Sequence, residues 1–308
     1  MSNQDEKIAR FMLSAVESNF SVNDLKQRTS KFIEYKKKEG FSFASLTKLH
    51  YEMFGGKEHS SIFQACAAVE IMVLALDIFD DLQDQDALDK PWCQTQQTIS
   101  MNIATGLLIL SMQMLSNTTF DESRKRDAIQ YMNQQVLKAV QGQHQDLQQQ
   151  IKTEDDYLQM VHNKSGSLMA CACIVGVSLV TPDKHEQVLE YATNFGIAAQ
   201  IQNDIQDVIR GDTKNDLLYK KHTLPTLKLL EENNEYAEWA RSYYNGLVDK
   251  SYMYENKREL LDWIRNSSSI MYVQVLKRVY QRKTIQHIEE IDTNSKMRHK
   301  LMQLIEQI

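Results

Sequence analysis

The amino-acid sequence predicts an all-α protein, and three of its properties carry this prediction. Glycine and proline are scarce, with 10 Gly and 3 Pro among 308 residues, so few residues force a turn. Helix-favouring residues such as Leu, Gln, Lys, Glu and Ala are plentiful. Apolar residues recur at a spacing near 3.6 along most of the chain. Together these properties indicate long helices and almost no sheet.

Each expected helix follows this apolar spacing, and turn-favouring residues separate many of the helices. In the first half of the chain, helices are expected over residues 5–18, 22–37, 43–53, 60–86, 95–115 and 121–150, with breaks at Gly55-Gly56, Lys90-Pro91 and Asn117-Thr118. In the second half, they are expected over 154–180, 184–210, 223–232, 235–248, 255–284 and 295–307, with breaks at Thr181-Pro182, Gly211-Asp212 and Asn233-Asn234. Because no linker or repeat interrupts this series, a single domain over residues 1–308 is expected.

The composition disfavours several classes of function. The formal net charge is −6 with both signs interspersed, so no broad basic face is expected and no nucleic-acid partner is predicted. The first twenty residues lack the long apolar core of a secretory signal, and the weakly polar stretch 166–180 is too short to span a bilayer. The cysteines are not spaced as metal ligands and are expected to be reduced thiols: Cys66, Cys93, Cys171 and Cys173. A cytoplasmic protein is expected, with peripheral membrane contact left open.

Four aspartates lie along one side of the predicted helix 60–86. Asp77, Asp80, Asp81 and Asp84 are separated by three or four residues or are adjacent, and they follow directly on the apolar run 71–76. Like charges at that spacing repel each other, so a cation is expected between them. Oxygen ligands without nearby His or Cys suit Mg²⁺. A solvated acidic helix end is the alternative for this cluster taken alone.

A second acidic cluster ends the predicted helix 184–210, where Gln200, Asp204 and Asp207 share one face. Two such helix ends can face each other across a bundle core, where metal sites are commonly built. Lys164 lies between the clusters in sequence and Lys221 follows them, and lysines act as point charges for phosphate oxygens. The pair of clusters therefore favours a metal-assisted diphosphate site.

Five segments, in order, resemble the motifs of the trans-prenyl diphosphate synthase superfamily. Asp80 to Asp84 resembles its first Asp-rich motif, and Gln200 to Asp207 resembles the second, with Asn203 in place of an Asp. The other segments are Gly142-Gln143-His144-Gln145-Asp146-Leu147, Lys164-Ser165-Gly166, and Lys221 with Thr223-Leu224-Pro225. The resemblance extends over most of the chain, from about residue 55 to residue 225.

This resemblance implies a class I isoprenoid synthase fold, which is a helical bundle around a central apolar cavity. It also implies that three Mg²⁺ ions bridge the Asp clusters to an allylic diphosphate, whose C–O bond ionises. The implied metal ligands are Asp80, Asp81, Asp84, Asp204 and Asp207. The residues implied to bind diphosphate are Lys57, Lys164 and Lys221, and those implied in catalysis are Asp80, Asp84, Lys164, Lys221 and Gln200. A homodimer is implied as well.

The sequence departs from chain-elongating members of the superfamily where they bind isopentenyl diphosphate. The segment 55–60 keeps Lys57 of the expected Gly-Gly-Lys-x-x-Arg pattern but has Glu58 and Ser60 at basic positions. Asp89-Lys90-Pro91 stands where an Arg pair is expected. A second diphosphate would lose bidentate guanidinium contacts and would meet carboxylates. The acceptor is therefore expected to be something other than isopentenyl diphosphate.

These departures, with the local sequence around Phe54-Gly55-Gly56, Asp77-Ile78-Phe79-Asp80-Asp81 and Gln141-Gly142-Gln143-His144, resemble the ComQ-type isoprenyltransferases of quorum sensing. That group attaches a geranyl or farnesyl group to a Trp of a small pheromone precursor peptide. The resemblance implies the same acceptor here, because an uncharged indole ring needs no second phosphate pocket. Ala75 and Leu76, one turn before the first Asp motif, are expected either to line the prenyl pocket or to pack in the core.

Three alternatives remain at this point. A chain-elongating polyprenyl diphosphate synthase would use Lys57 and Lys90 for isopentenyl diphosphate. A non-catalytic partner subunit of another synthase is opposed by the acidic residues retained in both clusters. A terpene cyclase is disfavoured because Asp207 and Gly211 occupy the Ser or Thr and the Glu positions of its second metal motif. Further candidates for the cavity wall, with ordinary core or surface positions as the alternative, are Phe79, His144 and Phe195.

Overall fold

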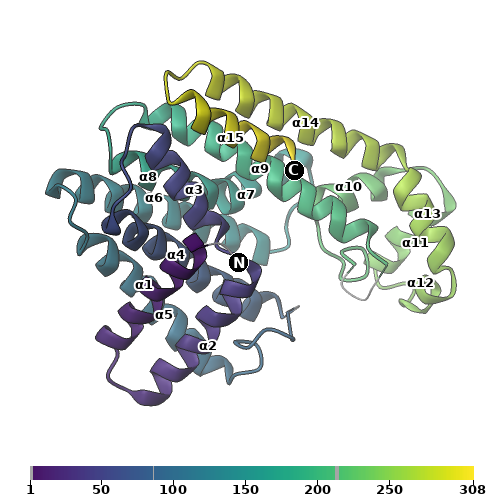
Figure 1. The fold of residues 1–308 in the computed structure, drawn as a ribbon. Coiled ribbons are helices and arrows are strands. Elements are labelled where there is room, and N and C mark those ends of the chain that lie inside the picture. Colours follow the sequence, from purple (N-terminus) through teal and green to yellow (C-terminus); the bar gives the residue numbers. More distant parts are fainter. Residues whose placement is uncertain (1–2, 86, 212–214) are drawn as a thin grey trace.

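The computed structural model describes residues 3–85, 87–211 and 215–308, and every regular element within them is a helix (Figure 1). The first half contains α1 (Asn3–Asn19), α2 (Asn23–Glu39), α3 (Ser42–Met53), α4 (Ser60–Asp84), α5 (Gln97–Ser116) and α6 (Glu122–Leu147). The second half contains α7 (Glu154–Val161), the π-helical turn η1 (His162–Gly166), α8 (Ser167–Ser178), α9 (His185–Ile209), α10 (Leu224–Glu231), α11 (Glu235–Tyr244), α12 (Ser251–Glu255), α13 (Lys257–Asn266), α14 (Ser268–Glu289) and α15 (Ser295–Glu306). The predicted all-α class is confirmed.

Two of the predicted helices are not single α-helices. The prediction for residues 255–284 is wrong, because α13 ends at Asn266 and α14 begins at Ser268. Ser267 between them has an extended backbone, and its hydroxyl accepts a hydrogen bond from the amide of Ile270, which caps α14. The predicted helix 154–180 is interrupted by η1. The predicted break at Gly211-Asp212 and the predicted helix end at 86 fall partly outside the described residues.

Helix α4 is a core helix of the bundle. Nearly all of its side chains between residues 61 and 75 are buried, which explains why its sequence is apolar on every side. Helices α4 and α5 are both long and apolar enough to cross a membrane, but 78% of the apolar window of α4 and 44% of that of α5 are buried inside the protein. The thiols of Cys66, Cys171 and Cys173 are buried in the same core, as expected of reduced cysteines.

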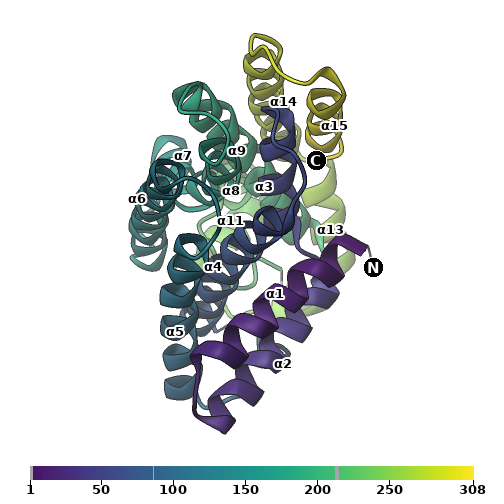
Figure 2. The same cartoon turned by 60° about the vertical axis from the view of Figure 1, so that its left-hand side comes forward.

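Two apolar clusters fill the interior. The larger cluster lies among α1 to α6, α8, α15, the first part of α9 and the end of α14, and the smaller one lies among α7, α10, α11, α13, the second part of α9 and the first part of α14. Helix α9 contributes to both, with Phe195 in the larger cluster and Ile201 in the smaller. In Figures 1 and 2, the hairpin of α1 and α2 lies beside α4, and Figure 1 shows α10 to α13 extending away on the other side of the molecule. Helix α9 thus joins the two halves of the bundle.

Candidate functional site

Two adjoining cavities lie where the ends of α4, α6 and α9 meet η1. A polar cavity of about 380 Å³ lies at the Asp-bearing ends of α4 and α9. An apolar cavity of about 580 Å³ lies beside it, between α4, α6, α8 and α9. The two share six wall residues, Asp80, Gln83, Leu147, Lys164, Ser165 and Gln200. A ligand with a charged head and an apolar tail could therefore occupy both cavities at once.

The polar cavity collects almost all of the residues predicted for the site. Eight of them line it, namely Asp80, Asp81, Asp84, Lys164, Gln200, Asp204, Asp207 and Lys221. The ninth, Lys57, is exposed and lines neither cavity. The structure thus brings together both Asp clusters and both phosphate-binding lysines predicted near them, and it places Lys57 elsewhere.

Lys164 connects the end of α4 to α6. Its ammonium group lies 3.0 Å from Asp80 Oδ1 and 2.7 Å from Asp146 Oδ2. Although burial opposes its charge, the two carboxylates raise the pKa of Lys164, so this lysine stays charged. Asp84, one turn further along α4, has no such partner in the described residues. Burial and the nearby charge of Asp80 raise its pKa to about 6.

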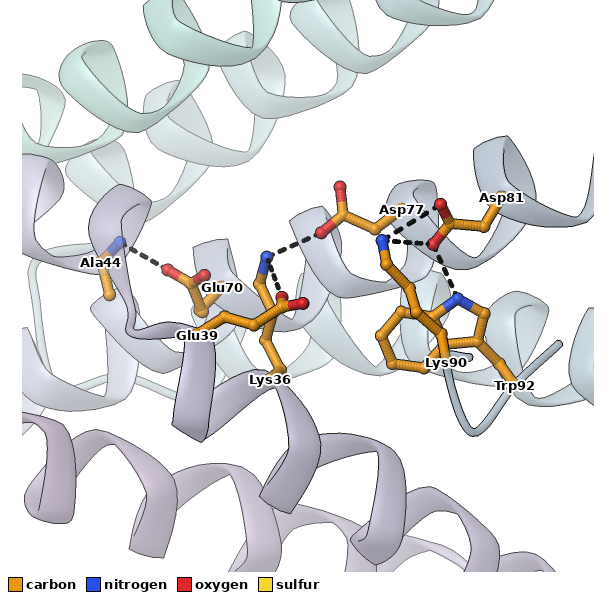
Figure 3. A network of polar contacts seen from close by, with 8 residues as sticks. All are labelled: Lys36, Glu39, Ala44, Glu70, Asp77, Asp81, Lys90 and Trp92. Atoms are coloured by element: carbon orange, nitrogen blue, oxygen red, sulfur yellow. Dashed lines mark hydrogen bonds and ion pairs between the residues drawn. The ribbon is translucent and has the colours of Figure 1, made fainter. Parts of the chain in front are cut away.

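Asp81 is held from the side of α4 nearer to α2 (Figure 3). Its carboxylate oxygens lie 3.1 and 2.8 Å from Lys90 Nζ, and Oδ2 also accepts a hydrogen bond of 2.7 Å from Trp92 Nε1. Trp92 is fully buried and packs edge-on against Phe32 and Tyr35 of α2. Asp81 therefore anchors the loop after α4, and Lys90 is already paired with a carboxylate.

On α9, Asp204 is held by neutral hydrogen-bond donors. Its Oδ1 accepts a 2.7 Å hydrogen bond from Gln200 Nε2, and its Oδ2 accepts one from the Tyr157 hydroxyl. Gln200 in turn accepts a 2.6 Å hydrogen bond from the Ser165 hydroxyl of η1. Burial raises the pKa of Asp204 to about 6. This chain of hydrogen bonds fixes the direction of the carboxylate without neutralising it.

Sequence reasoning assigned no role to Asp146 and Asp216, although both line the polar cavity. Asp216 follows Asn215, whose amide nitrogen donates to the carbonyl oxygens of Val208 at 2.6 Å and Arg210 at 2.9 Å. These bonds fold the chain back over the end of α9. Burial and the charge of Asp204 raise the pKa of Asp216 to about 7. Asp146 lay inside the Gly142 to Leu147 motif, whereas no sequence pattern pointed to Asp216.

Two glycines allow η1 to carry Lys164 into the site. A Cβ atom on Gly142 of α6 would lie 2.3 Å from the backbone nitrogen of Lys164. A Cβ atom on Gly196 of α9 would lie 2.7 Å from the carbonyl oxygen of Ser165. The backbones of α6 and α9 thus pack directly against η1, which no larger residue would permit. A π-helical turn at this position is also typical of functional sites.

The polar cavity has the donors and the charge that a hard cation requires. Seven aspartates stand against three lysines on its wall, and Lys90 and Arg210 outside the wall pair with two of them, so the carboxylates still outnumber these cations. Burial is the main cause of the raised pKa values of Asp84, Asp204 and Asp216, and neighbouring carboxylates raise them further. Among the described residues, no three acidic, His or Cys side chains already enclose one ion. Mg²⁺ needs only one or two carboxylates when phosphate oxygens and water complete its shell, so this arrangement fits it.

The apolar cavity is lined mainly by hydrocarbon side chains from four helices. Leu76 and Phe79 of α4 form part of its wall, as does His144 of α6. Ala75 and Phe195, in contrast, are buried in the larger core and do not line it. Of the residues expected either on this wall or in the core, three are therefore on the wall and two are in the core.

An all-helical bundle with facing Asp clusters and an adjoining apolar cavity defines the isoprenoid synthase class. Solved structures agree with this class. A geranylgeranyl pyrophosphate synthase superposes with a TM-score of 0.82, 19% identity and coverage of 100% of this chain and 98% of that one. The corresponding enzyme of the archaeon Geoglobus acetivorans gives a TM-score of 0.83 and 19% identity, covering 99% of this chain and 97% of that one.

Sequence comparison assigns the family. The chain belongs to the polyprenyl synthetase family, whose pattern it matches over residues 42–264. It is 33% identical over 288 residues to the tryptophan prenyltransferase ComQ of Bacillus subtilis (strain 168), covering 91% of this chain and 92% of that protein. It is 31% identical to the ComQ of Bacillus subtilis subsp. natto, covering 96% and 90%. These matches confirm the predicted family and fold.

Proposed function

We propose that the protein transfers a geranyl or farnesyl group from its diphosphate to a Trp of a small pheromone precursor peptide in quorum sensing. Family membership and the similarity to ComQ tryptophan prenyltransferases over more than 90% of the chain indicate a prenyltransferase. The observation that carries the proposal is the shared wall between the polar and the apolar cavity. That wall fits a substrate with a diphosphate head and a hydrocarbon tail.

In this proposal the polar cavity holds the diphosphate. Lys164 and Lys221 supply positive charge to its oxygens. The proposed ligands of three Mg²⁺ ions are Asp80, Asp84, Asp204 and Asp207. Asp81, the fifth aspartate implied by the sequence motif, is proposed to remain with Lys90 and Trp92, which hold its oxygens. Bound Mg²⁺ supplies Lewis-acid stabilisation of the negative charge on a leaving diphosphate. Gln200 acts by positioning Asp204 through its hydrogen bond.

The apolar cavity receives the prenyl chain in this proposal. Leu76, Phe79 and Met169 offer hydrocarbon surface beside Asp80 and Lys164, where the C–O bond would break. Exclusion of water from this cavity would protect the allylic cation from hydrolysis. The aromatic face of Phe79 would add favourable electrostatic contact with the cation.

The acceptor is proposed to be uncharged because the cations available for a second diphosphate are displaced or already paired. Lys90 is bound to Asp81, with an Nζ to Oδ2 distance of 2.8 Å. Lys57 lies outside both cavities. The neighbouring Glu58 adds negative charge and pairs with Lys48 at 3.0 Å. An indole ring needs none of these cations, so the arrangement favours a Trp side chain over isopentenyl diphosphate.

The protein is further proposed to be a cytoplasmic, single-domain homodimer, with any membrane contact limited to its surface. Helices α5 and α6 pack together on one side of the molecule (Figure 2). Their outer surfaces carry exposed apolar side chains, namely Met101, Ile109 and Leu137. An exposed apolar face of this kind is typical of an interface between subunits.

The proposal is tested by incubating the protein and Mg²⁺ with geranyl or farnesyl diphosphate and following products by mass spectrometry. One arm contains a Trp-containing peptide and the other contains isopentenyl diphosphate. We expect a prenyl mass increment on the peptide that is lost without Mg²⁺ and in Asp80→Ala. A lengthened diphosphate instead would identify a chain-elongating synthase. Absence of all turnover, with activity appearing only on addition of another synthase, would identify a non-catalytic subunit.

A further inference from the structure

Asp77 places a carboxylate in the wall of the apolar cavity, on α4 and one turn before Asp80. Its neighbours on that wall include Phe43, Leu76 and Phe79. A charge beside apolar groups costs free energy unless it is paired, and Asp80 adds repulsion at i+3. Binding of a hydrocarbon chain gives no reason for a carboxylate at this position. Its presence therefore calls for a further role.

Lys36 of α2 forms an ion pair with Asp77 and fixes the direction of its carboxylate. Asp77 Oδ2 lies 2.8 Å from Lys36 Nζ, whose side chain is only 12% exposed. Burial opposes the charge of Lys36, but Asp77 and the nearby Glu70 and Glu39 raise its pKa, so the lysine remains protonated. Figure 3 shows one Asp77 oxygen directed at Lys36 and the other pointing away from it. In the described part of the chain, Oδ1 forms no hydrogen bond.

We propose that Asp77 Oδ1 binds the N–H of the acceptor indole and takes its proton during prenyl transfer. This inference rests on the proposed transfer to Trp. The indole N–H is a donor without acceptor capacity, so it requires an acceptor wherever the ring is buried. A carboxylate gives a charge-assisted hydrogen bond to that donor. Of the two carboxylates on this wall, Asp77 is the one that lies away from the diphosphate end, and Lys36 holds it with Oδ1 left without a hydrogen bond in the described residues.

The chemical step balances with Asp77 as the proton acceptor. The allylic C–O bond breaks, and its electron pair leaves with the diphosphate. The π electrons of the indole form a C–C bond to the prenyl carbon, which places positive charge on the ring nitrogen. The N–H proton then passes to Asp77, leaving a neutral prenylated ring and a carboxylic acid. No oxidant, reductant or further reactant is required.

Other polar groups on the same wall suit this role less well. Asp80 is paired with Lys164 at 3.0 Å and lies at the diphosphate end. Gln143 donates from Nε2 to Gln83 Oε1 at 3.0 Å, and an amide does not take up a proton at neutral pH. His144 also lies on this wall, but it is exposed to solvent and no hydrogen bond holds its ring in the described residues. Asp77 is thus the residue proposed to bind the acceptor indole and to take its proton.

The test compares Asp77→Asn with Lys36→Met and Glu39→Gln, using farnesyl diphosphate, Mg²⁺ and a Trp-containing peptide. Loss of a general base typically costs 10²-fold or more, so kcat for peptide prenylation by Asp77→Asn should fall by at least about 10²-fold. The product should shift from prenylated peptide towards free prenyl alcohol. Lys36→Met removes the same ion pair but keeps the carboxylate, and it should lose far less. Glu39→Gln, which alters only the outer partner of Lys36, serves as the matched control.

Chemical rescue distinguishes a proton acceptor from a residue that only supports the structure. Formate added to Asp77→Ala should restore peptide prenylation, whereas added chloride should not. The inference is overturned if Asp77→Asn prenylates the peptide at the wild-type rate, or if Lys36→Met loses as much activity as Asp77→Asn and formate restores nothing. Failure of the proposed function looks different, because the wild-type protein itself would then leave the peptide unmodified.

Discussion

The negative charges of the two aspartate clusters of the polar cavity are compensated in different ways. At the end of α4, Asp80 and Asp81 each meet a lysine, with ion pairs of 3.0 Å to Lys164 and 2.8 Å to Lys90. At the end of α9, the hydrogen bonds of Asp204 in the described residues come from uncharged donors, the Gln200 amide and the Tyr157 hydroxyl. One cluster is therefore partly neutralised by the protein, whereas the centre of the other is oriented but not neutralised.

This difference indicates what each cluster contributes. Uncharged donors fix the direction of a carboxylate but leave its negative charge available to a cation. Lys164 would in turn be able to move towards diphosphate oxygens if a metal ion took its place beside Asp80. We therefore expect Asp204 to depend on a metal ion to balance its charge, although the neighbouring Asp207 is already paired with Arg210 at 3.0 Å. On α4, Asp80 would exchange Lys164 for a metal ion, whereas Asp81 would keep Lys90.

The largest expected effect comes from applying the same substitution to both clusters. Asp204→Asn keeps the carbonyl oxygen and the shape of the side chain but removes the charge that a metal ion needs. We expect kcat/KM for prenyl transfer to fall by about 10²- to 10³-fold, the scale of losing one electrostatic contact to the reacting group. Asp81→Asn should cost less than about 10-fold, because Lys90 and Trp92 already hold that carboxylate. Steady-state kinetics with saturating Mg²⁺ measures both.

Equal losses in the two variants would mean that Asp81 leaves Lys90 and binds metal, as the sequence motif predicts. If Asp204→Asn kept the full wild-type activity, Asp204 of the α9 cluster would not be a metal ligand. Circular dichroism and thermal melting of each variant separate these results from misfolding.

A smaller effect is expected from displacing Lys164, the lysine beside Asp80. Gly142→Ala places a methyl group 2.3 Å from the backbone nitrogen of Lys164, so η1 must shift. Overpacking against backbone typically costs about 1–3 kcal/mol, although Ala is otherwise the better helix former. We expect the free energy of unfolding, measured with urea, to fall by about 2 kcal/mol. The activity should fall as well, since Lys164 is carried by η1.

Gly106→Ala is the matched control, because Gly106 also lies within a helix. A Cβ atom there meets only the far end of the Phe20 ring, at 3.2 Å. That ring can yield more readily than backbone, so this variant should be close to neutral. If Gly142→Ala proved as stable as Gly106→Ala, the close packing of α6 against η1 would be refuted.

The elements that carry the chemistry could be predicted from the sequence, because periodicity and motif coincide in them. Helices α4 and α9 end at Asp84 and Ile209, within two residues of the predicted ends at 86 and 210. Apolar residues at a spacing of 3.6 require a helix, and the aspartates at i, i+3 and i+4 then share one side of it. The prediction that the two Asp clusters face each other rested on these two local properties.

Other features depend on tertiary contacts that leave no local pattern. The pairing of Asp81 with Lys90 and Trp92 arises because the loop after α4 folds back, and Asp216 enters the site because Asn215 binds carbonyl groups near the end of α9. Lys57 belongs to a recognisable segment, yet the chain places it outside both cavities. The break at Ser267 is a single cap within a continuous apolar pattern. Periodicity and short sequence motifs alone could not predict these features.

The smallest expected effect tests directly whether Asp204 is oriented but not neutralised. Burial raises its pKa from the ordinary 3.8 to about 6, so between these pH values the folded, metal-free protein holds a proton that the unfolded chain has lost. This contribution to stability is complete below pH 4 and disappears as the pH rises through 6. The free energy of unfolding of the wild type relative to Asp204→Asn should therefore fall by about 1.4 kcal/mol between pH 5 and pH 7.5.

Urea unfolding in EDTA at the two pH values measures this difference. The comparison with Asp204→Asn is needed because His50, whose pKa burial lowers to about 4, acts in the opposite direction in both proteins and cancels. Asp216 does not cancel, because the charge of Asp204 helps to raise its pKa, and it adds to the expected fall. Adding Mg²⁺ and inorganic diphosphate at pH 7.5 should stabilise the wild type more than the variant, since only the wild type keeps the charge. A pH-independent difference would show that a cation of the protein already balances Asp204, and the contrast between the two clusters would then be lost.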